Sequence, residues 1–544
     1  MALDLSHKKL LVVDDFPEMR SMVRKMAVAF RGNDIDDAKN GVEAVKMLEK
    51  KKYDIVLCDY NLGEGKDGQQ VLEEAKHREL INYATVFMLI TAENTVEMVM
   101  GAMEYHPDGY LSKPFTKTEF AARLEKILEK KSDLAAIEKA ISRKDNVGAI
   151  ALCNEKIAAN PKNAFELLKI KAELCEKTGD FAEAGSIYEK VLSGRDVPWA
   201  ALGLARVRYH TKDYMAAREM LQDLIEKNNS FVEAYDWLAK TYEALGDLTQ
   251  AQRILVDAVH ISPKAILRQK ALADVAYKNK DLDMAETAFK RVIRIGKSSC
   301  FKKADDYAGL SKVYLDKKSP TDALKVISSV REDFDNAPEA NLQAAVVEGR
   351  IYKDLGQTEM AEKSIAEATH IFSNLAGNVS TEVAMDLAKT CFALGKKEQG
   401  ENLVKYVVRN HHEDESVLKQ AQALFTELGM GDEGKALIAS TRQEVIDVNN
   451  QGVQLAKEGK LEESIEFFAK AASGMPDNQT INLNAAQSLI MHMQKNGKND
   501  KYLYQTRQYL DRIRLIDPTN EKYQKLLAIY KKIVSGGGAA AAAG

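Results

Sequence analysis

The stretch KKLLVVDDFPEMR, Lys8 to Arg20, sets four apolar residues directly before two adjacent aspartates, Asp14 and Asp15. The apolar run is typical of a short, buried strand, and the residues after it are apolar at helical spacing. Two carboxylates side by side repel each other, so their place at the end of a buried strand calls for a positive partner.

The first 130 residues repeat this alternation of a short apolar run and an amphipathic segment. Expected strands and helices follow one another, with strands at 10–13, 34–38, 54–59, 85–91 and 109–112, and helices at 18–30, 41–50, 68–77, 95–105 and 116–130. Such alternation predicts a doubly wound α/β fold, in which helices cover both faces of a parallel sheet of five strands.

Polar residues stand where these expected strands end. They are Asp14 and Asp15 on the first strand, Asp59 on the third, Thr91 on the fourth and Lys113 on the fifth. Ligands of parallel sheets bind at this edge. Three converging carboxylates suit Mg²⁺, which would let Asp59 act as a nucleophile toward a phosphoryl group. Lys113 supplies a charge for phosphate and Thr91 a hydroxyl donor.

In order and placement these residues resemble the receiver domain of bacterial two-component response regulators, over about residues 8–130. The resemblance implies a flavodoxin-like sheet of strand order 2-1-3-4-5, with Asp59 as phospho-acceptor and Thr91 and Lys113 as its catalytic partners. It implies that Mg²⁺ is held by Asp14, Asp15, Asp59 and the backbone carbonyl of Asn61. It makes Tyr110, with Thr91, the switch, and Asn61 and Glu93 the residues that tune dephosphorylation.

Some features of this region depart from the family pattern or leave alternatives open. The loop DYNLGEGKDG, which begins at Asp59, lacks the family's proline and is about one residue longer, which bears on access to Asp59. Taken alone, Asp14-Asp15 would fit a solvated turn. On the expected fourth helix, Met98, Met100 and Met103 form a candidate interface, and a single exposed methionine is the alternative.

After residue 130 the sequence repeats a turn followed by a small residue. Ala184, Ala217, Ala251 and Ala285 are 33, 34 and 34 residues apart. The series continues at similar intervals on either side, with Ala149, Ala323, Ala361, Gly400, Gly434 and Ser464. A period near 34 resembles the tetratricopeptide repeat, a pair of helices that stacks into a solenoid. The consensus fits best at 165–290 and 445–535, and the repeat type at 300–440 is less defined.

We therefore expect a receiver at 1–130, a tetratricopeptide-type helical array at 131–535, and a Gly/Ala tail or linker remnant at 536–544. Residues 1–125 carry 17 Lys+Arg against 22 Asp+Glu, and the remainder 60 against 59. This balance does not favour nucleic acid as a partner. Scattered cysteines, no leader and no long apolar run favour a cytoplasmic protein with no membrane span. His411 and His412 lack a third metal ligand and are predicted to lie on the surface.

The function predicted is that of a phosphorylation-gated adaptor with no enzyme activity beyond its own phosphorylation and dephosphorylation. A sensor histidine kinase or phosphotransfer protein would load Asp59, and the array would gain or lose a protein partner. The alternative is a constitutive scaffold whose receiver is a docking module or phosphate sink. Nucleic-acid binding and an enzyme acting in trans find less support, and homodimerisation is left open.

Overall fold

The five strands form one parallel sheet. The computed structural model describes residues 3–92, 106–143, 145–159, 164–375, 379–517 and 520–534. The strand order is β2-β1-β3-β4-β5 and confirms the predicted fold. The strands are β1 (Lys9–Val13), β2 (Asp34–Ala38), β3 (Ile55–Asp59), β4 (Val86–Thr91) and β5 (Gly109–Ser112).

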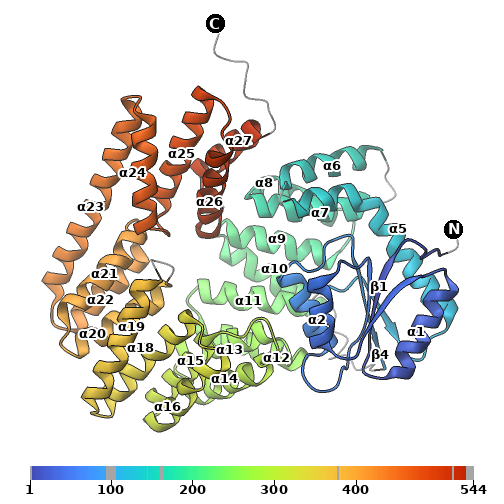
Figure 1. Cartoon of the computed structure of the whole chain (residues 1–544), viewed down its shortest axis with the longest axis horizontal. Helices are drawn as coiled ribbons and strands as arrows, with labels where there is room; N and C mark the ends of the chain where they lie inside the picture. The colour runs from blue at the N-terminus through green and yellow to red at the C-terminus, as the bar shows by residue number, and fades with distance from the viewer. Residues whose placement is uncertain are drawn as a thin grey trace, which may run out of the picture. The chain divides into compact units, whose positions relative to one another are not determined.

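Alternate residues of the strands are buried on opposite faces of the sheet, beneath different helices. Leu10 and Val12 of β1 pack with α1 (Pro17–Ala29) and with the first half of α5 (Lys117–Ser142). Leu11 and Val13 pack on the other face with α2 (Gly41–Lys50) and α3 (Gly68–His77). Helices lie over both faces of the sheet (Figure 1). Because both faces are covered, the central strands β3 and β4 are fully buried and apolar up to the polar residue that ends each of them.

Helix α5 belongs to both the receiver and the array. Its first half buries Phe120, Leu124 and Ile127 against the sheet. Its second half buries Leu134 and Ile137 in a separate cluster with the next two helices. No proline or glycine interrupts its 26 residues, so one continuous helix joins the two parts.

The helices of the array fall into two compact units. In the first unit, residues 1–306, they are α6 (Asn146–Ala159), α7 (Ala164–Thr178), α8 (Phe181–Leu192), α9 (Pro198–His210), α10 (Tyr214–Lys227), α11 (Val232–Ala244), α12 (Leu248–Ile261), α13 (Ile266–Lys278) and α14 (Leu282–Gly296). The division from the second unit, residues 307–544, falls within α15 (Ala304–Asp316).

The second unit is also helical throughout its described part. Its helices are α16 (Pro320–Ser328), α17 (Val330–Asp333), α18 (Pro338–Asp354), α19 (Thr358–Asn374), α20 (Thr381–Ala393), α21 (Lys397–Asn410), α22 (Glu415–Glu427), α23 (Gly431–Lys457), α24 (Leu461–Gly474), α25 (Gln479–Asn496), α26 (Asp500–Ile516) and α27 (Glu521–Val534).

Every small residue of the predicted repeat is buried at the fourth position of a helix. From Ala149 in α6 to Ser464 in α24, each lies where the second helix of a pair meets the first. Glycine replaces alanine at 400 because a Cβ there would lie 2.8 Å from the Phe392 ring. A larger aromatic neighbour thus explains why the consensus changes in this part of the array.

The turn before each of these helices has a defined chemistry. Lys212 and Gly246 are examples of residues that adopt positive φ, 64° and 81°, at the end of the preceding helix. The next residue, Asp213 or Asp247, caps the new helix by accepting a backbone N–H three residues on. The recurring Gly/Lys-Asp pair is therefore a combined stop and start signal.

The prediction for His412 is wrong. Its side chain is 6% exposed, and Nδ1 lies 2.9 Å from the side-chain nitrogen of Asn478. The turn between α24 and α25 packs over it, since Asp477 N–H also donates to Asn410. A contact between residues 66 positions apart leaves no local pattern, so the sequence could not reveal it.

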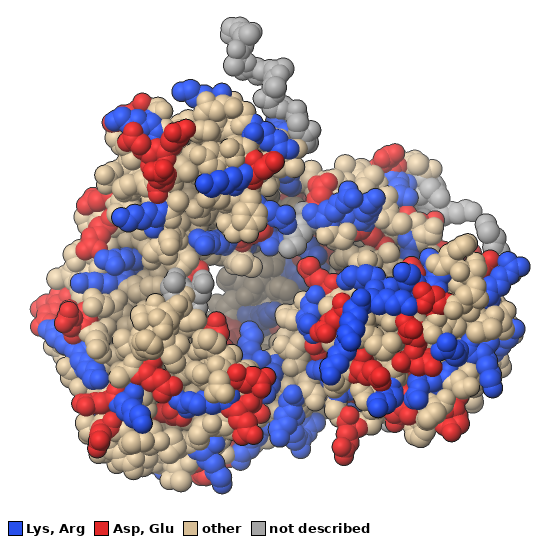
Figure 2. All heavy atoms as spheres, viewed as in Figure 1, with Lys and Arg blue, Asp and Glu red and all other residues tan. Residues whose placement is uncertain are grey.

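The surface carries both signs of charge. Figure 2 shows Lys and Arg side chains mixed with Asp and Glu over the face in view. All five cysteines are free thiols, and Cys58 is buried. Among the described residues, none of the helices has the length and apolar content needed to cross a bilayer. The predicted tail at 536–544 lies outside the described residues.

Candidate functional site

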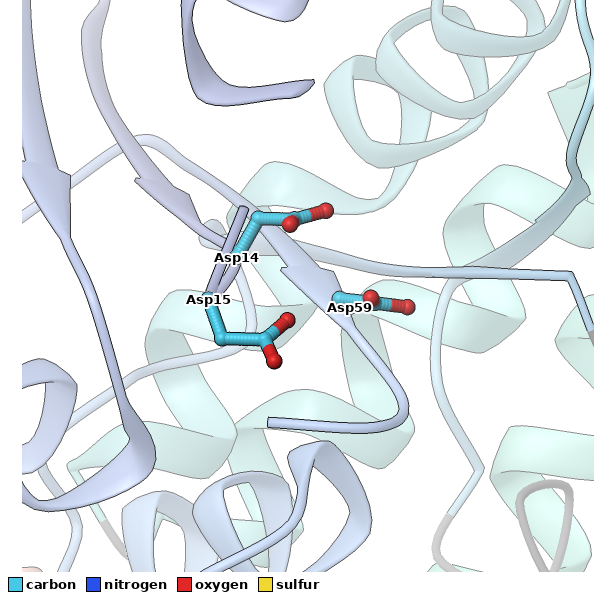
Figure 3. A group of neighbouring side chains, drawn as sticks. All are labelled: Asp14, Asp15 and Asp59. Carbon is cyan, nitrogen blue, oxygen red and sulfur yellow. The ribbon is translucent and has the colours of Figure 1, made fainter. Parts of the chain in front are cut away.

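Three carboxylates meet at the carboxyl edge of the sheet. Asp14 and Asp15 follow β1, and Asp59 is the last residue of β3. One oxygen from each lies within 4.8 Å of the others (Figure 3). The parallel pairing of β1 with β3 brings them together, since Val13 lies opposite Cys58. Asp14 and Asp59 are buried, and Asp15 is partly exposed.

Lys113, the residue after β5, bridges two of these carboxylates. Its Nζ lies 2.8 Å from Asp14 Oδ2 and 2.9 Å from Asp59 Oδ2. The backbone N–H of Lys113 donates to Thr91 O at 2.7 Å, which continues the pairing of β4 with β5 past the end of β5. The peptide bond from Lys113 to Pro114 is cis. The ammonium group of Lys113 thus contacts two of the three carboxylates of the cluster.

Burial and charge set the protonation of this pair. Burial raises the pKa of the Asp59 carboxyl, and Lys113 opposes that rise. Burial would lower the pKa of Lys113, but its hydrogen bonds to Asp14 and Asp59 outweigh it and raise the pKa. With all three acids ionised, one ammonium against three carboxylates leaves a formal charge of −2.

The residues present fit a divalent cation. Asp15 Oδ1 is buried and has no hydrogen-bond partner. A buried carboxylate oxygen without a donor is costly, and a hard cation with oxygen ligands would satisfy it. The remaining formal charge of the cluster, −2, would be neutralised by one divalent cation. The donor set, all carboxylate oxygen, is the kind that Mg²⁺ prefers.

Thr91 and Tyr110 lie near this cluster in the sheet. Thr91 is the last residue of β4 and is 2% exposed. Tyr110 on β5 is half-buried and packs against the core cluster under α2 and α3, which includes Leu89. The strand order thus places Thr91 on β4, the neighbour of β3, and Tyr110 on β5, the strand that Lys113 follows.

Close packing holds the loop that follows Asp59. A Cβ on Gly68 would collide with the backbone carbonyl of Asp59, and one on Gly41 would lie 2.5 Å from Lys66 O. Gly68 N–H donates to Tyr60 O at 2.8 Å. Asp67 caps α3 in a capping box with Gln70. Gly68, which sequence reasoning missed as a site residue, is signalled only by the Asp-Gly pair.

Some predicted site residues have a less defined place. Asn61 is exposed and follows Tyr60 in the loop. Glu93, predicted to tune dephosphorylation, and the candidate interface of Met98, Met100 and Met103 lie outside the described residues. The sequence also missed Arg20, whose guanidinium donates to Asp14 O at 2.7 Å, because no motif marks that contact.

Comparison with known proteins agrees with the two kinds of fold. Residues 10–125 match the response regulator receiver domain, and residues 176–241 and 232–264 match tetratricopeptide repeat models. The chain is similar to chemotaxis protein CheY-3 of Vibrio cholerae, at 34% identity over 22% of this chain and 92% of that protein. Chemotaxis protein CheY of Pseudomonas aeruginosa is 30% identical over 22% of this chain and 97% of its own.

One solved structure aligns with part of this chain. A tetratricopeptide repeat protein from Parabacteroides merdae aligns with 48% of this chain and 97% of its own, at 16% identity and a TM-score of 0.33. The sheet, the acidic cluster and the match at 10–125 define the class: the chain belongs to the response regulator receiver family. Its receiver is fused to tetratricopeptide repeats.

Proposed function

We propose that this chain is a phosphorylation-gated adaptor, in which Asp59 accepts a phosphoryl group and the receiver controls what the helical array binds. The observation that carries the proposal is the cluster of Asp14, Asp15 and Asp59, with Lys113 bridging its two buried members. The functional parts are a receiver at 1–130, an array at 131–535 and a tail at 536–544.

The chain's own groups account for the transfer. A carboxylate oxygen of Asp59 attacks the phosphorus of a phosphohistidine on a sensor kinase or phosphotransfer protein. The P–O bond forms as the P–N bond breaks, and the histidine leaves as the base. Lys113 and the Thr91 hydroxyl bind the phosphoryl oxygens, where an ammonium and a donor lower the cost of concentrated charge.

Asp14, Asp15, Asp59 and the backbone carbonyl of Asn61 would hold Mg²⁺, which supplies charge neutralisation for the approach of two anions. Asn61 and Glu93 would set the rate at which water removes the phosphoryl group. Tyr110 and Thr91 would form the switch, which favours one of two receiver states.

The second unit offers a pocket for a protein partner. Its volume is about 200 Å³, and it lies between α15, α18 and α20. Four cations line it with two carboxylates, namely Lys312, Arg350, Lys353, Lys389, Asp354 and Asp386. Lys312 pairs with Asp386 at 2.6 Å. Arg350 forms no ion pair with any residue that the structure describes, so it is available to a partner's carboxylate.

Two experiments test the proposal. Incubation with acetyl phosphate and Mg²⁺ should label wild type and Asp37→Asn but not Asp59→Asn, read by intact mass. Hydrogen exchange with Mg²⁺ and beryllofluoride should then change around Tyr110 and in repeats beyond about residue 135. Labelling with a response confined to the receiver would favour the scaffold reading, in which the receiver is a docking module or phosphate sink.

A further inference from the structure

The receiver also touches the array through residues outside α5. Loop 60–67 and helix α3 face two places in the first unit: residues 295–301, which are the end of α14 and the turn after it, and Lys264 between α12 and α13. We call this contact the α3 dock. It joins residues more than 190 positions apart, and it begins at the residue after Asp59.

Polar groups make most of the α3 dock. Lys66 Nζ donates to Ser298 O, and Gln70 Nε2 donates to Ile295 O at 3.4 Å. The Ser299 hydroxyl donates to Glu73 Oε1, to which the Cys300 thiol also lies at 3.5 Å. Glu73 is 4% exposed, so the array supplies donors to a carboxylate that is shielded from water. A buried charge that loses such donors is costly, which makes the contact specific.

Ring contacts complete the two ends of the α3 dock. His77 at the end of α3 meets Phe301 edge-on, with ring centroids 5.1 Å apart. At the other end, Lys264 Nζ lies 5.3 Å from the centre of the Tyr60 ring and 3.8 Å from Asp67 Oδ2. An ammonium over an aromatic face and beside a carboxylate is held by both.

The same backbone serves the α3 dock and the acidic cluster. Tyr60 follows Asp59 directly, and its N–H donates to Ile90 O at 2.9 Å. Its hydroxyl donates to Gln69 at 3.0 Å, and Gly68 fits against the Asp59 carbonyl. Asp59, Tyr60 and the start of α3 are therefore in direct packing contact, with no room for a side chain at 68, so a displacement of Asp59 would shift Tyr60 and α3 as well.

We infer that loop 60–67 and helix α3 form the output surface of this receiver, that its partner is the 295–301 turn with Lys264 of the same chain, and that the state of Asp59 and this contact are energetically coupled. The inference rests on the proposed function and adds where the signal leaves the receiver. It also assigns a role to the loop that departs from the family pattern, since that loop carries Lys66.

A disulfide across the dock measures the coupling. Glu73→Cys places a second thiol beside Cys300, while the other four cysteines are buried. The dissociation constant of beryllofluoride, with Mg²⁺, is measured for the oxidised and reduced forms of this full-length variant. Its disulfide formation constant in a glutathione buffer is measured with and without beryllofluoride. Glu73→Cys with Cys300→Ser is the control that cannot close.

The first ratio compares the beryllofluoride dissociation constants of the oxidised and reduced forms, and the second compares the disulfide formation constants with and without beryllofluoride. Because linkage is reciprocal, coupling requires both ratios to depart from 1 by the same factor, and about 5-fold or more is expected. Lys264→Ala should change the dissociation constant of beryllofluoride in the same sense as reduction of the disulfide. Lys240→Ala is its matched control, since Lys240 lies over Trp237, 4.6 Å from the ring centre, inside the array. It should leave that constant unchanged.

The outcomes separate the two proposals. If beryllofluoride fails to bind wild type, or binds Asp59→Asn equally well, the proposed function itself fails. If it binds through Asp59 but with equal constants in the oxidised and reduced forms and in Lys264→Ala, the inference is overturned and the adaptor stands. A Glu73→Cys variant that forms no disulfide, with an unchanged constant in Lys264→Ala, overturns it as well.

Discussion

Asp15 shows how a single side chain reveals the chemistry of its site. Its Oδ1 is buried without a hydrogen-bond partner, beside two further carboxylates. Asp15→Asn should therefore change the free energy of unfolding in opposite directions with and without metal. In metal-free protein we expect the free energy of unfolding to rise by about 1 kcal/mol, since repulsion is relieved. With Mg²⁺ it should fall below wild type, because binding is lost.

Urea unfolding with EDTA or with excess Mg²⁺ measures both effects, and calorimetry gives the Mg²⁺ affinity, expected to drop at least about tenfold. Asp37→Asn is the control, since Asp37 lies on the neighbouring strand β2 and pairs with Arg24 of α1 at 3.2 Å. A variant that lowers stability equally in both conditions would show that Asp15 has a structural role and no part in metal binding.

The strand-end residues could be placed from the sequence because parallel strands have one geometry. Once the alternation of strands and helices is recognised, Asp14, Asp59 and Lys113 must share an edge. The α3 dock and the burial of His412 could not be predicted in this way. Each depends on two turns far apart in the chain, and a turn sequence encodes its own conformation but not what packs on it.

At the scale of helices, two glycines of the array differ in what surrounds them. A Cβ on Gly434 of α23 would lie 2.7 Å from Cδ2 of Phe425, whereas one on Gly474 of α24 would meet nothing within 4 Å. Gly434→Ala should lower the free energy of unfolding by about 1–3 kcal/mol through overpacking. Gly474→Ala should raise it by a few tenths to about 1 kcal/mol through backbone entropy.

Urea unfolding midpoints of the two glycine variants give the comparison directly. The two changes in the free energy of unfolding need not be equal in size, but their signs must differ. A neutral Gly434→Ala would mean that Phe425 can move aside, and the change of consensus from alanine to glycine would then need another cause.

Helix α5 carries a carboxyl whose titration reports on the joint between receiver and array. Burial raises the pKa of Glu138 to about 7 from 4.5, against the attraction of Lys131. A raised folded-state pKa favours folding below the unfolded value, and this advantage is lost as pH rises through the folded value. Wild type should therefore lose about 1 kcal/mol relative to Glu138→Gln between pH 4.5 and 7, after discounting for solvent screening.

The measurement is the free energy of unfolding of both proteins at pH 5, 6 and 8. Glu129→Gln, on an exposed position of the same helix, serves as the control and should track wild type. Parallel curves for wild type and Glu138→Gln would contradict the assigned burial of this carboxyl in the joint.

The periodic elements followed from the sequence better than their boundaries did. Each repeat carries its own cap, turn and small residue, so local signals sufficed for helix starts. They did not predict that α23 would run for 27 residues, because no proline or capping residue interrupts it and its end is set by Gly459 at positive φ. Nor does the period mark residue 306, since each repeat packs mainly on its neighbours.

Over the whole molecule the basic and acidic residues nearly balance, so a local surplus of basic residues in the second unit is informative. The chain has 77 basic and 81 acidic residues, yet the pocket between α15, α18 and α20 has four cations against two carboxylates. Arg350 is its one cation without an ion pair among the described residues. We expect a partner to place a carboxylate there, and a fluorescent glutamate-rich peptide to bind as a minimal probe.

Arg350→Glu should weaken that probe about tenfold or more, since it removes a charge-assisted bond and adds repulsion. Raising the salt from 50 to 300 mM should weaken binding to wild type for the same reason. Lys363→Glu, an exposed change on α19 outside the pocket lining, is matched in charge and should alter binding less than about twofold. Equal losses in both variants would mean that the probe senses only the net charge of the array, and the pocket would then have no special part in choosing a partner.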